Sequence, residues 1–161
     1  MAELDRFRDA QDSSYEGFES ALAEVRSGGK RGHWIWYVFP QIGGLGSSGA
    51  SQKYAIRDEA EALEFLRDPD LRSRYVTIAQ AVAAQLKAGK PLRALMGSEI
   101  DAKKVVSSLT LFGYVSKKIH DTEGIDACRP VATVADEVLT LAAGQGYQPC
   151  AYTLRRIRES T

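Results

Sequence analysis

Residues 71–86 have the sequence LRSRYVTIAQAVAAQL, in which apolar side chains recur at steps of three and four. Side chains with this spacing lie along one face of a helix, and we expect that face to pack against the core: Leu71, Tyr75, Ile78, Val82 and Leu86. Further helices are predicted along most of the chain, at residues 55–66, 101–115, 131–143 and 149–158, with a short turn at residues 92–96. The sequence therefore predicts a mainly α-helical fold.

Several of these helices have recognisable ends. An apolar stripe over residues 4–25 is interrupted near residues 12–14, where Ser13 and Glu16 have the spacing of a capping box, so two helices are expected there. Gly28 gives the second of them a left-handed end. Pro69 is tolerated in a first helical turn, and Asp68-Pro69 therefore divides residues 55–66 from the helix that follows. The polar residues 116–129 are predicted to form a loop.

Residues 33–40, HWIWYVFP, interrupt the helical pattern. Aromatic and β-branched residues crowd positions 34–39, which favours a short buried strand, with a helix as the alternative. On a strand, Trp34 and Trp36 would share one face. The glycine-rich residues 43–51 follow as a loop. Together these features predict one compact domain over residues 1–161, mainly α with little sheet.

Composition excludes several classes of function. The 161 residues include 21 Lys plus Arg and 21 Asp plus Glu, so no strong field attracts nucleic acid or an anionic membrane. No apolar run approaches the ~20 residues of a membrane span, and the acidic start is unlike a secretory signal. A cytoplasmic protein is expected, with Cys128 and Cys150 reduced. His33 and His120 lack a second ligand at metal-binding spacing, so we expect no metal and no cofactor.

Residues 44–49, GLGSSG, match the dinucleotide-binding pattern G-x-G-x-x-G after a predicted strand. A Rossmann unit would need a second buried strand that ends in an acidic residue about 20 positions on, and none is recognisable. The loop is therefore either a plain connection or a phosphate-contacting loop of another kind. In the second case Gly44 and Gly46 allow the backbone to approach the phosphate.

Two clusters of side chains are candidates for chemistry. Trp34 and Trp36 either anchor the core or form a wall on which a flat base stacks, with His33 as hydrogen-bond partner or general acid. On the helix at 101–115, Asp101, Lys104, Ser107 and Ser108 form either a solvated ion pair with hydroxyls or a grip on ribose and phosphate. Asp101 is the best candidate for a catalytic carboxylate.

Two motifs resemble one bacterial family. They are H-W-x-W-x-x-F-P-Q-x-x-G-L-G-S over residues 33–47 and S-S-L-T-L-F over residues 107–112. The chain resembles, over residues 6–112, the domain of unknown function numbered eighteen-ten, which is sometimes mislabelled calpastatin. Arg72 stands where glycine is expected and Leu109 where methionine is usual, and the residues after Val115 are not matched.

The resemblance implies a ligand class. The family's fold is similar to that of the NADAR superfamily, whose name records NAD and ADP-ribose and whose members act on N-glycosidic bonds of ribosylated compounds. It implies an N-glycosidase-like enzyme but carries over no catalytic residue. From the residues themselves, Asp101 is the expected catalytic carboxylate and His33 the expected acid. Expected ligand-binding residues are Trp34, Trp36, Gln41, Gly44, Gly46, Ser47, Tyr54, Lys104, Ser107 and Ser108. The alternatives are a nucleotide sensor without turnover and a partner-binding helical module.

Overall fold

The computed structural model describes residues 2–124 and 126–159, and most of them are helical. The elements in chain order are η1 (Ala2–Leu4), α1 (Asp5–Gln11), α2 (Phe18–Ser27), α3 (Ile35–Val38), α4 (Gly49–Lys53), α5 (Glu59–Arg67), α6 (Pro69–Lys87), α7 (Leu92–Met96), α8 (Glu99–Glu123), η2 (Asp126–Cys128), α9 (Arg129–Ala143) and α10 (Ala151–Glu159). The predicted mainly helical class is confirmed. No helix in the described residues is long and apolar enough to cross a membrane.

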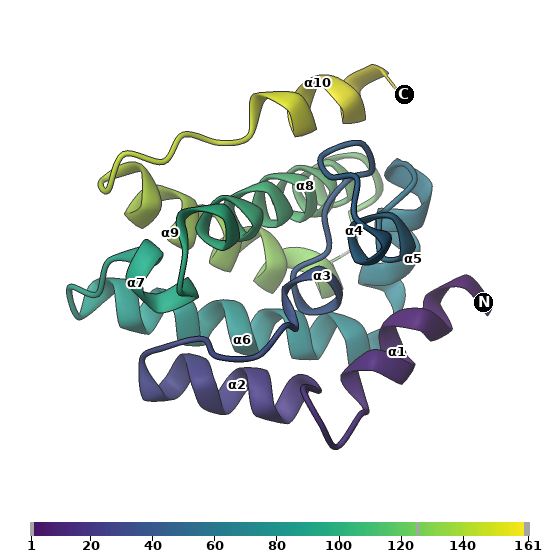
Figure 1. Ribbon diagram of the computed structural model, residues 1–161. Coiled ribbons are helices and arrows are strands. Elements are labelled where there is room, and N and C mark those ends of the chain that lie inside the picture. Colours follow the sequence, from purple (N-terminus) through teal and green to yellow (C-terminus); the bar gives the residue numbers. More distant parts are fainter. Residues whose placement is uncertain (1, 125, 160–161) are drawn as a thin grey trace.

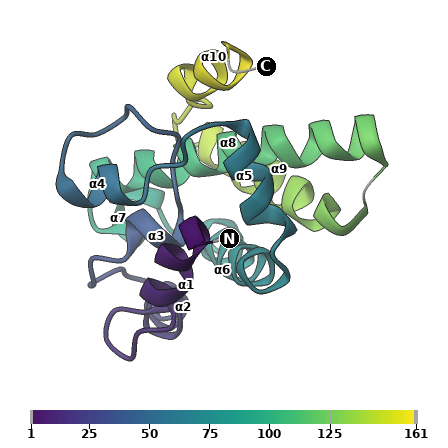
Figure 2. The ribbon, with the colours of Figure 1, turned by 90° about the vertical axis from the view of Figure 1, so that its right-hand side faces the viewer.

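Helix α8 lies at the centre of the arrangement. It packs against α5, α7, α9 and α10. Helix α6 packs against α9 and also against α2. Figure 1 shows α2, α6, α8 and α10 as successive levels of the molecule, and Figure 2 shows α10 outlying above α8. The buried residues form one core cluster that extends from Leu4 to Ile157.

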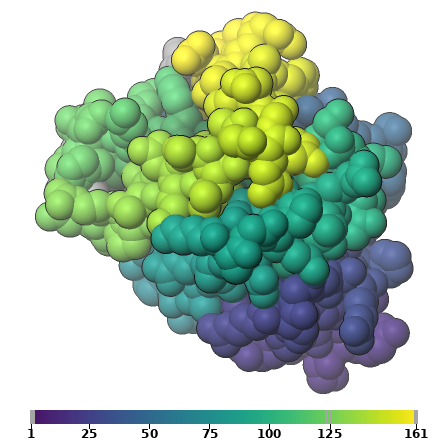
Figure 3. All heavy atoms as spheres, turned by 90° about the vertical axis from the view of Figure 1, so that its left-hand side faces the viewer, coloured from purple at the N-terminus to yellow at the C-terminus, as the bar shows by residue number. Residues whose placement is uncertain are grey.

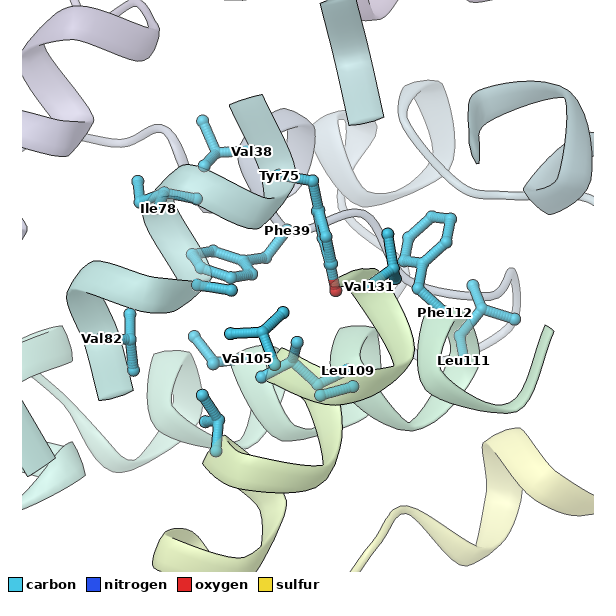
Figure 4. Packing of buried hydrophobic residues seen from close by; sticks show 14 of the residues in the cluster. Val38, Phe39, Tyr75, Ile78, Val82, Val105, Leu109, Leu111, Phe112 and Val131 are labelled. Atoms are coloured by element: carbon cyan, nitrogen blue, oxygen red, sulfur yellow. The ribbon is translucent and has the colours of Figure 1, made fainter. Parts of the chain in front are cut away.

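Aromatic rings fill the middle of this core. Tyr75 of α6 contacts Phe39, Phe65 and Phe112, with ring centroids 5.7, 6.2 and 4.9 Å away. Figure 4 shows Phe39, Tyr75 and Phe112 between the helices that surround them. The Tyr75 hydroxyl, fully buried, lies 2.9 Å from Ser108 Oγ of α8. The residues expected to face inward on α6 are all buried, as predicted: Leu71, Tyr75, Ile78, Val82 and Leu86.

The strand predicted at residues 34–39 is wrong. The segment forms the short helix α3, preceded by Trp34 and followed by Phe39. A short apolar run bounded by a proline does not distinguish a buried strand from a buried helical turn, because both hide nearly every side chain. As a result Trp34 is fully buried, whereas Trp36 is only partly buried.

The strand expected before the glycine-rich loop is absent from the described residues, which agrees with the rejection of a Rossmann unit. In residues 2–124 and 126–159 the β-structure consists of one isolated parallel bridge, between Ile42 and Ile56. The helix predicted over residues 55–66 begins only at Glu59, because Asp58 caps it by accepting a hydrogen bond from the Glu61 N–H. The residues just before it form the bridge instead.

The two predicted N-terminal helices are confirmed, but their boundary differs from the capping box. Ser13 Oγ bonds the backbone of Tyr15, and α2 begins after Gly17. Gly28 ends α2 in the left-handed conformation, as predicted. The Asp68-Pro69 division is confirmed too, since the Asp68 carboxylate accepts the N–H groups of Asp70 and Leu71 at the start of α6.

The loop predicted at residues 116–129 is wrong over most of its length. Helix α8 continues to Glu123, followed by η2. Val115 and Ile119 extend its buried stripe, and Lys118 pairs with Glu59 of α5 at 2.9 Å. Polar composition predicted a loop here, but a helix with a single buried face is stable even when its other faces are polar.

Glu24 of α2 holds the segment that precedes α3. Its Oε1 accepts hydrogen bonds from the N–H groups of Arg31 and Gly32 and from Trp34 Nε1, at 2.7, 2.9 and 2.9 Å. Burial alone would raise the pKa of Glu24, but these hydrogen bonds and the charge of Lys30 outweigh it and lower the pKa. One carboxylate therefore fixes both the loop and the buried Trp34 ring.

We predict that Glu24→Gln lowers the free energy of unfolding at pH 7 by about 1 to 2 kcal/mol, because a neutral amide accepts weaker hydrogen bonds than a carboxylate. The folded-state pKa is lowered, so the contribution is complete above the unfolded value of about 4.3 and is lost as pH falls through the folded value. Urea unfolding at pH 7 and at acidic pH measures this. Glu19→Gln, at an exposed position of α2, is the control and should have no effect. A difference that persists unchanged at acidic pH would contradict the assignment.

Candidate functional site

Five of the residues predicted to bind a ligand line one small hollow beside α3 and α4. They are Trp36, Gln41, Gly44, Gly46 and Tyr54, and Leu45 is among the other residues that line it. The hollow has a volume of about 20 Å³, which is room for about one water molecule. Residues 36–54 therefore converge as the motif suggested, but around a space that holds only a small polar group.

Trp36 is the most distinctive wall of this hollow. Its indole N–H is buried and has no hydrogen-bond partner in the described residues. The ammonium group of Lys104 lies 4.8 Å from the centre of the Trp36 ring. An aromatic face, a cation and an unpaired donor thus meet at one place, and a bound acceptor would satisfy the donor.

Asp101 and Lys104 belong to a network of three charged residues. Asp101 Oδ1 lies 3.4 Å from Lys104 Nζ, and Oδ2 lies 2.8 Å from the Nζ of Lys30. The Lys30 side chain is 7% exposed and also donates to the Gly32 carbonyl oxygen at 2.6 Å. Asp101 therefore does more than form a solvated ion pair with Lys104. It also joins the loop before α3 to the first turn of α8.

A larger cleft lies next to the small hollow. It has a volume of about 310 Å³, and Leu45 lines both spaces. Its other walls come from α8 and from the residues before α10: Lys103, Val106, Ser107, Gly146, Tyr147, Gln148 and Cys150. Figure 3 shows the C-terminal segment, in yellow, at the surface of the molecule. Small-molecule sites usually have volumes of about 300–1,000 Å³, so the cleft is at the lower end of that range.

Six predicted site residues do not line either space: Asp101 and Lys104, which form the network with Lys30, and His33, Trp34, Ser47 and Ser108. His33 is exposed, and neither His33 nor Ser47 is among the residues that line the two spaces. Trp34 is fully buried, so a ligand does not reach its ring in this structure. Ser108 is also fully buried and bonds Tyr75. Ser107, one residue earlier, does line the cleft.

The glycine-rich loop is held by α10. Tyr152 donates a hydrogen bond to the Gly43 carbonyl oxygen at 3.1 Å. A Cβ atom on Gly44 would overlap the Tyr152 hydroxyl, and Gly44 also has a φ of +101°. At Gly46 a Cβ would meet Ser51 Oγ at 2.9 Å. Close packing within the protein is therefore reason enough for glycine at both positions.

Sequence reasoning missed the C-terminal wall of the site. Lys103, Tyr147 and Cys150 line the cleft, and Tyr152 supports the loop. The recognised motifs end at residue 112, so they gave no reason to connect these residues with residues 43–48. One available signal was Cys150, which lies in the first turn of the helix predicted at residues 149–158.

In residues 2–124 and 126–159, no three His, Cys, Asp or Glu side chains are grouped in a way that could hold a metal ion. Both Cys128 and Cys150 are free thiols. The side chains of this region supply hydroxyl, amine, carboxylate and thiol groups.

Comparison with known proteins identifies a family that the chain matches. Residues 1–126 match the family described as "Protein of unknown function (DUF1810)", which extends the similarity beyond residue 112. The conserved hypothetical protein Rv1873 from Mycobacterium tuberculosis has a similar crystal structure, with a TM-score of 0.76 and 31% sequence identity. The similarity covers 97% of this chain and 96% of that one. No curated protein matches the chain.

We predict that Gly44→Ala lowers the free energy of unfolding by about 1 to 3 kcal/mol, because it combines left-handed backbone strain with the overlap against Tyr152. Gly49→Ala is the matched control, since nothing lies within 4 Å of the added Cβ and the residue starts α4. Its effect should stay within about 0.5 kcal/mol. In a Tyr152→Ala background, Gly44→Ala should cost less, and urea unfolding of the double-mutant cycle measures the difference. Equal costs in both backgrounds would mean that Tyr152 does not limit position 44.

Proposed function

Because the chain belongs to the DUF1810 family of proteins of unknown function, we propose its function from the geometry of the site. We propose that it binds a phosphate-bearing nucleotide of the NAD or ADP-ribose type across the small hollow and the adjoining cleft. The ligand class follows from the resemblance of the family's fold to that of the NADAR superfamily. The observation that carries the proposal is the Trp36 ring, with its unpaired N–H and the Lys104 ammonium group against its face.

The charges around the two spaces suit a phosphate. Lys103 lines the cleft, and Lys104 lies beside the hollow. Lys104 shares Asp101 with Lys30, so the three side chains carry one positive charge in excess. Charge-assisted hydrogen bonds from lysine to phosphate are stronger than neutral ones. A ligand phosphate is therefore favoured near the start of α8.

The hollow and the cleft differ in size, and each suits a different part of a nucleotide. The hollow holds one small polar group, and the cleft holds a larger body against Leu45, Val106 and Tyr147. The Ser107 hydroxyl supplies a polar contact for a sugar in the cleft. A nucleotide that spans both spaces would cover Leu45, which is one of the exposed large apolar residues.

Cleavage of an N-glycosidic bond is the second candidate. It requires a carboxylate close to the anomeric carbon and an acid for the leaving base. Asp101 is the carboxylate linked to Trp36 through Lys104, but each of its oxygens is paired with a lysine. His33, the expected acid, is not among the residues that line either space. These contacts favour binding over cleavage.

We predict that ADP-ribose or NAD raises the melting temperature of the protein and that adenosine has a smaller effect, because adenosine lacks phosphate. A ligand at 100 times its dissociation constant adds about 2.7 kcal/mol to the free energy of unfolding. A thermal-shift series with NAD, ADP-ribose, ADP and adenosine measures this. If none of them changes the melting temperature at millimolar concentration, the protein is not a nucleotide-binding module. Release of free base from NAD in the same mixtures would instead support N-glycosidase activity.

We further predict that Lys104→Met weakens the binding of ADP-ribose by about tenfold, the loss expected for one charge-assisted hydrogen bond. Lys117→Met removes the same charge from an exposed position of α8 and should leave the affinity unchanged. Titration calorimetry on the three proteins gives the dissociation constants. An equal loss in both variants would assign the effect to net charge and not to the site.

A further inference from the structure

The two thiols of this chain lie in opposite surroundings. Cys128 is 1% exposed, and burial raises the pKa of its thiol although Arg72 and Arg67 act against this. Cys150 is partly exposed and lines the cleft of about 310 Å³. The thiolate is the reactive form of cysteine, so Cys150 is the candidate for chemistry. Cys128 serves as an internal comparison in the same chain.

Polar groups of two helices act on the pKa of the Cys150 thiol. Burial alone would raise its pKa, but the hydroxyls of Ser107 and Thr153 and the N–H groups of Thr153 and Tyr152 outweigh it and lower the pKa. Ser107 comes from α8, whereas the other donors belong to the first turn of α10, which has nine residues. The start of a helix adds positive potential to these contacts.

The Thr153 hydroxyl is an independent sign of the same preference. Its side chain is fully buried, and the hydroxyl has no hydrogen-bond partner in the described residues, although a Cys150 thiolate would be one. A neutral thiol is a weak acceptor, so the hydroxyl is poorly satisfied while Cys150 is protonated. A thiolate, or a ligand atom bound to that sulfur, would supply the missing acceptor. The surroundings thus favour negative charge or a substituent at Cys150.

We propose that Cys150 is a site of reversible mixed-disulfide formation with a small, negatively charged thiol compound. The Cys150 thiolate attacks one sulfur of the compound in its oxidised, disulfide form. A bond forms between Cys150 Sγ and that sulfur, and the disulfide bond of the compound breaks. Its other half leaves as a thiolate and takes up a proton from water. The disulfide is the oxidant, and a reduced thiol reverses the step.

The side chains that line the cleft determine which disulfide compound fits beside Cys150. Lys103, Ser107 and Gln148 provide polar contacts near Cys150, and Lys103 supplies a positive charge that a carboxylate can pair with. Apart from Cys150, the titratable side chains that line the cleft are Lys103 and Tyr147. The inference does not depend on the proposed nucleotide ligand, because the reaction is measured on the protein without nucleotide.

The first test measures which cysteine reacts. The full chain is incubated with oxidised glutathione, an anionic disulfide, and the adducts are located by peptide mass spectrometry. At pH 7 we expect the adduct at Cys150 to form at least about tenfold faster than at Cys128. Cys128→Ser should keep the fast reaction and Cys150→Ser should abolish it. Equal rates at the two cysteines would overturn the proposal.

The second test measures why Cys150 reacts. Ser107→Ala and Thr153→Val remove one hydroxyl donor each at little change in volume, and each should move the midpoint of the pH–rate profile upward. A midpoint unmoved in both variants would overturn the assigned role of the donors.

A third test concerns the charge of the compound. Lys103→Met should slow the reaction with oxidised glutathione but not with the neutral bis(2-hydroxyethyl) disulfide. Equal slowing with both reagents would contradict the preference for an anionic compound.

Discussion

The contact on which the rest of the arrangement depends joins Tyr75 of α6 to Ser108 of α8. The Tyr75 hydroxyl is fully buried and lies 2.9 Å from Ser108 Oγ. Leaving such a group unpaired would cost about 1 to 3 kcal/mol, so the bond fixes the register of α6 against α8 where apolar contacts alone would allow sliding. Its ring packs against Phe39, Phe65 and Phe112, which joins α5 and the segment after α3 to the same point.

The aromatic cluster around Tyr75 determines which tryptophan side chain of the motif is partly exposed to solvent. Phe39 is drawn into the aromatic core, and Trp34 is held in place by Glu24. The helical turn between them directs Trp36 to the other side, where Lys104 lies against its ring. The two tryptophans therefore have different roles, since one anchors the loop in the core and the other is a wall of the hollow. The interpretation of a core anchor is confirmed for Trp34, and base stacking on Trp36 stays a prediction.

Periodicity predicted the long elements because their buried faces are continuous: the apolar spacing over residues 71–86 corresponds to α6. Residues 92–96, expected as a short turn, form the short helix α7. Periodicity failed at residues 34–39, where burial on all sides removes the contrast between faces. It also failed after residue 115, since α8 keeps one buried stripe inside a polar stretch. For the site, the motif located the hollow, but contacts such as Tyr152 with Gly43 join residues too distant in sequence for local patterns to reveal.

The matched family segment and the wall of the cleft are different parts of the chain. Residues 1–126 match the family, and they contain Trp36, Lys104 and Ser107. The opposite wall, Gly146 to Cys150, and the Tyr152 contact that supports the loop come after that segment. The backbone N–H of Cys150 donates to Thr110 Oγ1, inside the S-S-L-T-L-F motif, at 3.1 Å, and the Tyr147 hydroxyl donates to Glu99 at the start of α8. Polar contacts therefore fix this wall to α8. The motif thus provides part of the floor of the cleft and an attachment point, whereas the C-terminal segment provides the opposite wall.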